Sequence, residues 1–213
     1  MKKKGAIFDL DGTLIDSMKV WENADHIIAD RYGFVPDNEY LSFVTTRSFL
    51  EGADYITTRY NLRKTKWEIM DELYEIALND YKNNIILKPG VKELLKKFSS
   101  DGMKMGIATS NMEEMTHEVL KSNGIFEYFE AFAYCDEVGK NKAFPDVYNL
   151  AAKGLGLSAS DCYIFEDIPY AVKGAKLSGA EVIGVYDIYS AEKEDELRKA
   201  AHRFIMSFED FIY

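Results

Sequence analysis

The chain has 213 residues, 47% hydrophobic and 14% aromatic, so it can bury a sizeable core and does not have the composition of a disordered protein. Its 36 acidic and 26 basic residues give a formal net charge of −10, which argues against a nucleic-acid backbone or an anionic membrane as a partner. No apolar segment approaches the roughly 18 residues that span a bilayer, and we expect a cytoplasmic protein whose two cysteines, Cys135 and Cys162, are reduced and buried.

The chain opens on a short apolar run followed by two acidic residues. Residues 4–8 predict a buried strand that ends before Gly12. If this strand continues through Leu10, the side chains of Asp9 and Asp11 share one face, because side chains alternate along a strand. Two carboxylates at such a short distance repel each other unless a cation or a shared proton offsets the charge. Asp-Gly is also a common turn pair, but the pattern favours a functional site over a plain turn.

The segment from residue 16 to residue 86 predicts helices only. Apolar residues recur at spacings of three and four over 17–32, 38–60 and 66–82. Pro89-Gly90 marks the end of this block. We therefore expect a helical domain over 16–86, inserted into an α/β domain made of residues 1–15 and 87–213.

From residue 90 onward, predicted helices and strands alternate. Helices are expected over 90–99, 112–122, 145–154, 169–178 and 191–201, and strands over 103–108, 131–135, 162–166, 181–186 and 203–206. Strands separated by helical segments of this length indicate βαβ units. The predicted fold is an α/β, doubly wound parallel sheet with helices on both faces and a small all-helical domain inserted after the first strand.

Three further polar segments follow predicted strands. Thr109-Ser110-Asn111 precedes a helix, where hydroxyl and amide groups can bind an anion or simply cap the helix. Lys140 or Lys142, just before Pro145-Asp146, can neutralise a phosphate or a carboxylate. Glu166-Asp167 ends the predicted strand over 162–166, and we favour a metal-ligand role for this pair.

These segments would meet at one edge of the sheet, because the carboxyl ends of parallel strands lie together. A few carboxylates combined with phosphate oxygens form the usual Mg²⁺ site. The three histidines are scattered, and the two cysteines lack metal-ligand spacing, so zinc is not expected. Asp9, Asp11, Glu166 and Asp167 are thus the candidate metal ligands.

In its motifs the chain resembles the haloacid dehalogenase superfamily, in the helical-cap subgroup that includes β-phosphoglucomutase and phosphoglycolate phosphatase. Asp9-Leu10-Asp11-Gly12-Thr13 matches Asp-x-Asp-Gly-Thr, and Ile107-Ala108-Thr109 matches an apolar strand ending in Thr or Ser. The family's Lys-x-x-Pro-Asp motif matches residues 142–146, which selects Lys142 over Lys140. Glu166-Asp167 matches the final acidic pair.

The resemblance implies a mechanism through an aspartyl phosphate. Asp9 would be the nucleophile and Asp11 the general acid and base. Thr109 and Lys142 would stabilise the phosphoryl group, with Ser110 and Asn111 in contact with the substrate. Mg²⁺ would be held by Asp9, Asp167 and the backbone carbonyl of Asp11. Glu166 would contact these ligands and not the ion.

Residues of the predicted helical domain bear on the choice of substrate. β-Phosphoglucomutase uses a histidine from its first cap helix, and the position that matches here is Trp21, which favours a phosphatase over a mutase. Arg47 falls where this cap type has its substrate-facing loop, which would indicate a second anionic group on the substrate. The alternative is that Arg47 is an exposed arginine on a helix. The Ile168-Pro169 pair departs from the small hydroxyl residue that usually follows the acidic pair.

The sequence thus predicts a Mg²⁺-dependent phosphatase for a small phosphorylated metabolite, such as a sugar or polyol phosphate. A phosphosugar mutase is the alternative enzyme. A phospho-accepting signalling module and a phosphate-binding protein without turnover are alternatives of other classes. The expected partner is the small substrate, without nucleic acid or membrane, and the expected state is a monomer or weak homodimer.

Overall fold

The computed structural model describes residues 3–44 and 49–212. The chain forms two compact units, one made of Met1–Ser17 with Ile85–Tyr213 and the other of Met18–Asn84. The domain junctions expected from the sequence, 15/16 and 86/87, each lie two residues away from these divisions. Among the described residues, none of the helices combines the length and the apolar character that crossing a membrane requires.

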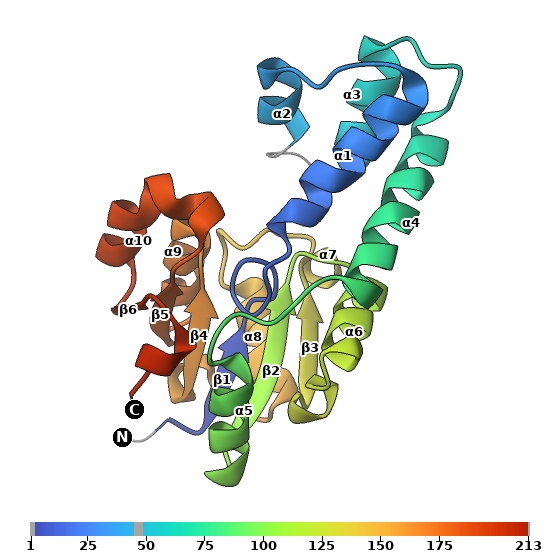
Figure 1. Ribbon diagram of the computed structural model, residues 1–213. Coiled ribbons are helices and arrows are strands. Elements are labelled where there is room, and N and C mark those ends of the chain that lie inside the picture. Colours follow the sequence, from blue (N-terminus) through green and yellow to red (C-terminus); the bar gives the residue numbers. More distant parts are fainter. Residues whose placement is uncertain (1–2, 45–48, 213) are drawn as a thin grey trace. The chain divides into compact units, whose positions relative to one another are not determined.

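The first unit is built on a parallel sheet (Figure 1). Its six strands run in the order β3-β2-β1-β4-β5-β6. Their bounds are β1 Gly5–Phe8, β2 Lys104–Thr109, β3 Ala131–Tyr134, β4 Cys162–Glu166, β5 Glu181–Val185 and β6 Arg203–Ile205. Each neighbouring pair is parallel. The predicted α/β fold is confirmed, and the strand order reverses beside β1, where open sheets of this kind bind ligands.

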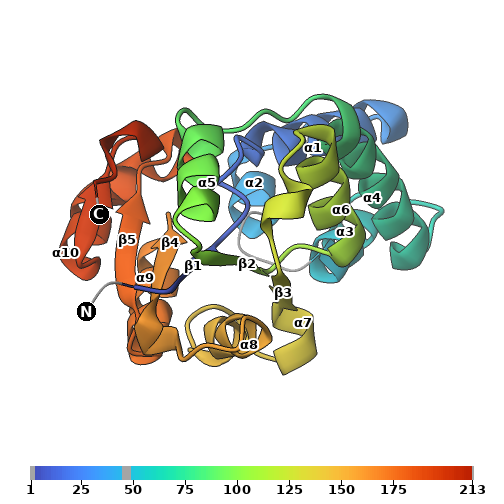
Figure 2. The ribbon, with the colours of Figure 1, turned by 90° about the horizontal axis from the view of Figure 1, so that it is seen from below.

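Helices cover both faces of this sheet, as Figure 2 shows. Helices α5 (Val91–Ser100) and α6 (Glu113–Ser122) lie on one face, and α8 (Asp146–Gly154) and α9 (Pro169–Leu177) lie on the other. Helix α10 (Glu194–Ala200) adds Leu197 to the apolar cluster that contains Val172 of α9 and Val182 of β5. The short helix α7 (Cys135–Val138) and the 3₁₀ segments Phe126–Tyr128, Ala159–Asp161, Ile188–Lys193 and Phe208–Asp210 complete the unit.

Two consecutive residues of β1 enter opposite halves of the core. Ile7 belongs to the cluster under α8 and α9. Phe8 stacks on Phe165 with ring centroids 4.7 Å apart and also contacts Phe98 and Phe208. This alternation explains why β1 is apolar at every position, because both of its faces are covered. Burial of each such side chain stabilises the fold by about 1.5–3 kcal/mol.

The second unit contains four described helices. They are α1 (Met18–Tyr32), α2 (Asn38–Val44), α3 (Phe49–Arg59) and α4 (Lys66–Asn83). Thr65 and Glu68 form a capping box that starts α4. The helices share one apolar core, made of Ala24, Ile28, Tyr40, Ala53, Ile56, Ile69 and Leu73.

The predicted helical segment 38–60 contains two helices in the structure, α2 and α3. The rings of Tyr40 and Tyr55 lie 6.3 Å apart. Fifteen residues of a single straight helix would separate them by roughly 22 Å. The apolar spacing continues through both helices because both face the same core, so the pattern alone does not reveal the break.

Candidate active site

The loop that follows β1 places Asp9 and Asp11 differently from the prediction. The strand ends at Phe8, although the Asp9 amide still donates to the carbonyl of Phe165 at 3.0 Å. The carbonyl of Leu10 then accepts hydrogen bonds from the amides of Thr13, Leu14 and Ile15, so the chain turns at Leu10. The two aspartates are therefore not alternate residues of one strand, and Asp11 lies in the turn.

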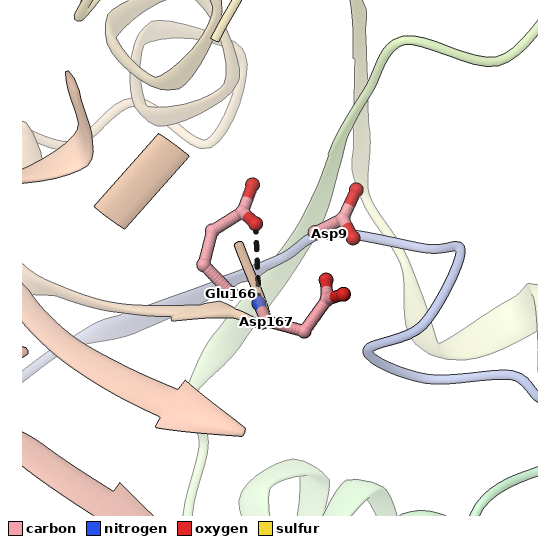
Figure 3. Close-up of side chains that lie close together, drawn as sticks. All are labelled: Asp9, Glu166 and Asp167. Atoms are coloured by element: carbon pink, nitrogen blue, oxygen red, sulfur yellow. Dashed lines mark hydrogen bonds between the residues drawn. The ribbon is translucent and has the colours of Figure 1, made fainter. Parts of the chain in front are cut away.

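A cluster of three buried carboxylates lies where β1 and β4 end. Asp9, Glu166 and Asp167 each offer an oxygen atom, and these atoms lie within 4.8 Å of one another (Figure 3). The adjacent Gly12 has a φ of +81°, and a Cβ atom there would lie 2.5 Å from Oδ2 of Asp167. Glycine is required at this position by both its conformation and the space. Thr13 completes the contact by donating from Oγ1 to Oδ1 of Asp167 at 2.9 Å.

Lys142 neutralises part of this cluster. Its buried ammonium group donates to Oδ1 of Asp9 and, at 2.6 Å, to Oε1 of Glu166. The hydroxyl of Tyr148 also donates to Oε1 of Glu166 at 2.8 Å. Lys140, the other candidate lysine, instead forms an exposed pair with Asp146 at 2.8 Å. Of the two lysines, only Lys142 lies in the acidic cluster.

The hydrogen bonds divide the carboxylates into two kinds. Both oxygens of Glu166 accept hydrogen bonds, since Oε2 takes the amide of Asp167 at 3.2 Å. Oδ2 of Asp9 and Oδ2 of Asp167 take no hydrogen bond from the residues that the structure describes. Asp9 and Asp167 are thus better placed than Glu166 to bind a cation, and Glu166 holds Lys142.

The charges of the cluster fit a divalent cation. Three carboxylates and one ammonium carry a formal net charge of −2 when all are ionised. Burial raises the pKa of Glu166 and of Asp167, and the neighbouring carboxylate of Asp9 raises both further. Burial lowers the pKa of Lys142, but Asp9 and Glu166 raise it more, so its pKa lies above the ordinary lysine value. A small hard cation bound by carboxylate oxygens would offset the excess charge.

Asp11 is held from two directions. Ser17 donates from Oγ to Oδ1 of Asp11 at 2.7 Å, and Asn111 donates from Nδ2 to Oδ2 at 2.9 Å. The orientation of its carboxylate is therefore fixed by two hydrogen bonds, and Asn111 contacts Asp11 in addition to the substrate contact predicted for it.

The segment that follows β2 does not act as a simple helix cap. Helix α6 has Met112 as its N-cap residue, without a side-chain capping bond. Oγ1 of Thr109 instead accepts the amide of Asn111 at 2.9 Å. Oγ of Ser110 lies 3.3 Å from Sγ of Cys135. Cys135, expected inside a strand and buried, is half-buried and begins α7.

Two further candidate residues, Arg47 and Trp21, belong to the segment predicted to form the helical domain. Arg47 lies outside the described residues. Trp21 belongs to α1 of the second unit, where its ring lies 6.1 Å from that of Tyr81. Ile168 and Pro169, which depart from the family pattern, are the N-cap residue and the first residue of α9.

Sequence reasoning missed two residues that orient this site, Ser17 and Tyr148. Ser17 stands directly before α1, where a serine is typical of a helix cap. Tyr148 lies at an apolar spacing typical of a core position on α8, and that signal conceals its hydroxyl contact.

Several curated proteins similar to this chain are named as phosphatases. Hexitol phosphatase A of Escherichia coli is 32% identical over 190 residues, which cover 87% of this chain and 84% of that protein. A phosphorylated carbohydrates phosphatase of Thermotoga maritima is 26% identical over 192 residues, which cover 84% and 83% of the two chains.

Solved structures share the fold. A β-phosphoglucomutase from Clostridium difficile superposes with a TM-score of 0.78 at 22% identity, covering all of this chain and 94% of that one. The model of the haloacid dehalogenase-like hydrolase family matches residues 6–185, from β1 to the end of β5. This match spans most of the chain and includes Asp9, Lys142 and Asp167. We conclude that the chain belongs to the haloacid dehalogenase-like hydrolases, as its sequence motifs predicted.

Proposed function

We propose that this hydrolase is a Mg²⁺-dependent phosphatase that acts on a small phosphorylated sugar or polyol through an aspartyl phosphate. The observation that carries the proposal is the contact of Asp9 with the buried ammonium of Lys142 inside the carboxylate cluster. Asp11 follows Asp9 by two residues in the same loop. The names of the two curated relatives, a hexitol phosphatase and a phosphorylated carbohydrates phosphatase, support a carbohydrate or polyol substrate. The predicted cytoplasmic location and the predicted monomer or weak homodimer are part of this proposal.

In the first proposed step, Asp9 attacks the phosphorus atom. A bond forms between a carboxylate oxygen of Asp9 and phosphorus, and the bond from phosphorus to the alcohol oxygen breaks. Asp11 in its protonated form gives a proton to the departing oxygen, so the product leaves as a neutral alcohol. The ammonium of Lys142 and the hydroxyl of Thr109 would stabilise the charge on the phosphoryl oxygens.

In the second proposed step, the aspartyl phosphate is hydrolysed. Asp11, now a carboxylate, accepts a proton from a water molecule whose oxygen attacks phosphorus. The bond between phosphorus and the Asp9 oxygen breaks, which releases inorganic phosphate and restores both aspartates. Ser17 and Asn111 keep the Asp11 carboxylate in place for both proton transfers.

Asp9 and Asp167 would hold the Mg²⁺ ion, with the backbone carbonyl of Asp11 as a third ligand. When bound, the ion offsets negative charge on the cluster and on the phosphoryl oxygens. Both oxygens of Glu166 already accept hydrogen bonds, so Glu166 would not bind the ion. Instead, Glu166 keeps Lys142 charged and in position.

Phosphate release tests the proposal. We would measure release from p-nitrophenyl phosphate and from a panel of hexitol and sugar phosphates, with Mg²⁺ and with EDTA, for the wild type and Asp9→Asn. The expected result is Mg²⁺-dependent release that Asp9→Asn abolishes. Asp195→Asn, an exposed substitution on α10, is the matched control and should not change release.

The same experiment distinguishes the alternatives. A mutase would interconvert sugar phosphate isomers only when a sugar bisphosphate is added, with little net phosphate release. A phospho-accepting module would label Asp9 without turnover. Failure of the folded wild type to release phosphate from any substrate would overturn the phosphatase proposal.

A further inference from the structure

Lys88 makes an unusual set of contacts just after the chain returns from the helical unit. Its ammonium group donates to the carbonyl of Gly12, to the carbonyl of Tyr186 at 2.8 Å, and to Oδ2 of Asp187 at 2.6 Å. The side chains of Lys88 and Asp187 are 13% and 3% exposed. An ammonium group has three N–H donors, so all three are used in fixed directions. Lys88 thus joins the loop after β1 to the end of β5.

The backbone already holds the two segments together without this side chain. The Lys88 amide donates to the carbonyl of Leu14 at 2.9 Å, and the Asp16 amide donates to the carbonyl of Ile86 at 3.1 Å. Ile15 and Leu87 form an antiparallel bridge between these hydrogen bonds. The side chain of Lys88 therefore adds a contact at the tip of the loop, where Gly12 lies between Asp11 and Thr13.

The tip of this loop is enclosed between two charged groups. On one side the carbonyl of Gly12 meets the ammonium of Lys88. On the other, the α-carbon of Gly12 faces Oδ2 of Asp167, where even a Cβ atom would clash at 2.5 Å. Any shift of Gly12 thus moves Asp11, its direct neighbour, relative to the acidic cluster.

The Lys88 cluster extends to the strand end that carries Asp167. Asp187, the acidic partner of Lys88, accepts the amide of Tyr189 at 2.8 Å. Ser190, in the same 3₁₀ segment, donates from Oγ to the carbonyls of Asp187 and Asp167 at 3.3 and 3.4 Å. The position of the Gly12 carbonyl is thereby set by the ends of both β4 and β5.

A purely stabilising role does not explain this arrangement well. Replacing a buried ion pair by apolar residues of similar volume is often neutral for stability, because desolvation offsets the attraction between the charges. What such a pair does supply is a fixed direction for its hydrogen bonds. Here that direction is used on a backbone carbonyl in the loop that carries Asp11.

We propose that Lys88 is a positioning residue for proton transfer by Asp11. Its ammonium, held by Asp187 and the Tyr186 carbonyl, fixes Gly12 and thereby the distance of Asp11 from the phosphoryl group on Asp9. This inference rests on the proposed function, because it assigns Asp11 the transfer of a proton to the leaving group.

The choice of leaving group gives a test that a structural role would not pass. A sugar or polyol alkoxide needs a proton to leave, whereas p-nitrophenolate leaves readily as an anion. We expect Lys88→Met to lower kcat for a hexitol phosphate by about 10- to 100-fold, with much less effect on p-nitrophenyl phosphate and little change in KM. Lys88→Gln, which keeps one amide donor, should fall between the wild type and Lys88→Met.

A matched control comes from the amino end of β2, away from the carboxyl ends of the strands. Lys104 donates from Nζ to the carbonyl of Leu155 at 2.8 Å, which is also an amine-to-carbonyl contact. Lys104→Met should leave kcat unchanged for both substrates. An equal fall in kcat for both substrates in Lys88→Met, or no fall for either, would overturn the proposal.

Amide hydrogen exchange tests the positioning separately from catalysis. Exchange over residues 9–16 should be faster in Lys88→Met than in the wild type or Lys104→Met. A wild type that releases phosphate from neither substrate would overturn the proposed function, and faster exchange over 9–16 would still support the fixing of the loop by Lys88. Unchanged exchange over 9–16 would overturn that fixing.

Discussion

The hydroxyl of Ser17 donates to Oδ1 of Asp11 at 2.7 Å, across a turn of six residues. Asn111 holds the other oxygen of the same carboxylate. Asp11 is therefore oriented by one residue from its own loop and one from the segment after β2. A residue proposed to give and take a proton in successive steps has to keep one position through both, and these two hydrogen bonds provide it.

Removing the hydroxyl of Ser17 should weaken turnover without unfolding the protein. A hydrogen bond to a charged group contributes about 1.5–3 kcal/mol, so we expect Ser17→Ala to lower kcat for a sugar or polyol phosphate by about tenfold or more. Ser158→Ala is the control, because Ser158 makes an exposed hydroxyl contact with Ser160 at 3.0 Å. Equal kcat values for Ser17→Ala and Ser158→Ala would show that Ser17 does not orient Asp11.

The sheet and the positions of the charged motifs could be predicted because they follow from local patterns. Apolar strands separated by helices define a parallel sheet, and parallel strands bring residues such as Asp9, Thr109 and Asp167 to one edge. Lys142 could be selected over Lys140 only through the resemblance to a known family. In the structure, the two lysines differ sharply in burial, which spacing along the chain does not encode.

The residues that orient the site could not be predicted, because each carries a local signal for another role. Ser17 precedes a helix and so resembles a capping residue. Tyr148 has the spacing of a core aromatic on α8. Lys88 precedes Pro89-Gly90, where a lysine is ordinarily exposed. Their partners are distant in the chain or depend on a turn, and only the folded chain brings them together.

Lys142 and Lys140 form a natural pair for mutation. Lys142→Met leaves Asp9 and Glu166 buried without their shared cation, and breaking a buried ion pair costs about 3–5 kcal/mol. We expect the unfolding free energy to fall by about that amount and phosphate release to be lost. Lys140→Met breaks only an exposed pair with Asp146, so it should change the unfolding free energy by less than about 1 kcal/mol.

Chemical denaturation and phosphate release would measure both effects. Similar losses in the two lysine variants would contradict the distinct positions of Lys142 and Lys140. Normal turnover by a folded Lys142→Met variant would contradict the role proposed for the ammonium group.

The helical unit offers a test of pH dependence that is separate from the metal site. Tyr40 of α2 donates its hydroxyl to Oδ1 of Asp25 on α1 at 2.5 Å. Burial raises the pKa of Asp25, and the nearby Glu22 raises it slightly. The hydrogen bond from Tyr40 and the nearby His26 lower it by less, so the pKa of Asp25 lies above the ordinary value. A carboxyl whose pKa is raised on folding favours the folded state when protonated, and this contribution is lost as the pH rises through the folded-state pKa.

Asp25→Asn should therefore stabilise the helical unit relative to the wild type at pH 7, and the difference should shrink as the pH falls through the raised folded-state pKa of Asp25 toward about 4. The amide oxygen still accepts the hydrogen bond from Tyr40. Both tryptophans of the chain, Trp21 and Trp67, lie in this unit, so tryptophan fluorescence during urea denaturation follows its unfolding alone. A variant less stable at pH 7 than the wild type would show that ionised Asp25 stabilises the unit.

Binding of Mg²⁺ can be measured without any turnover. A ligand that binds only the folded state stabilises it by about 2.7 kcal/mol at 100 times its Kd. We expect added Mg²⁺ to raise the Tm of the wild type, and EDTA to reverse the rise. Asp167→Asn removes charge from an oxygen that takes no hydrogen bond from the described residues, so most of the Mg²⁺-dependent rise should disappear.

The same substitution should act oppositely when Mg²⁺ is removed by EDTA. Burial and the adjacent carboxylates of Asp9 and Glu166 disfavour the charged form of Asp167. A neutral amide relieves that repulsion while Thr13 can still donate to its oxygen, so Asp167→Asn in EDTA should be at least as stable as the wild type. The exposed control Asp195→Asn should keep the wild-type response to Mg²⁺. An Asp167→Asn variant with an undiminished rise in Tm would place the cation elsewhere, because the one acidic cluster found among the described residues would then not be needed to bind it.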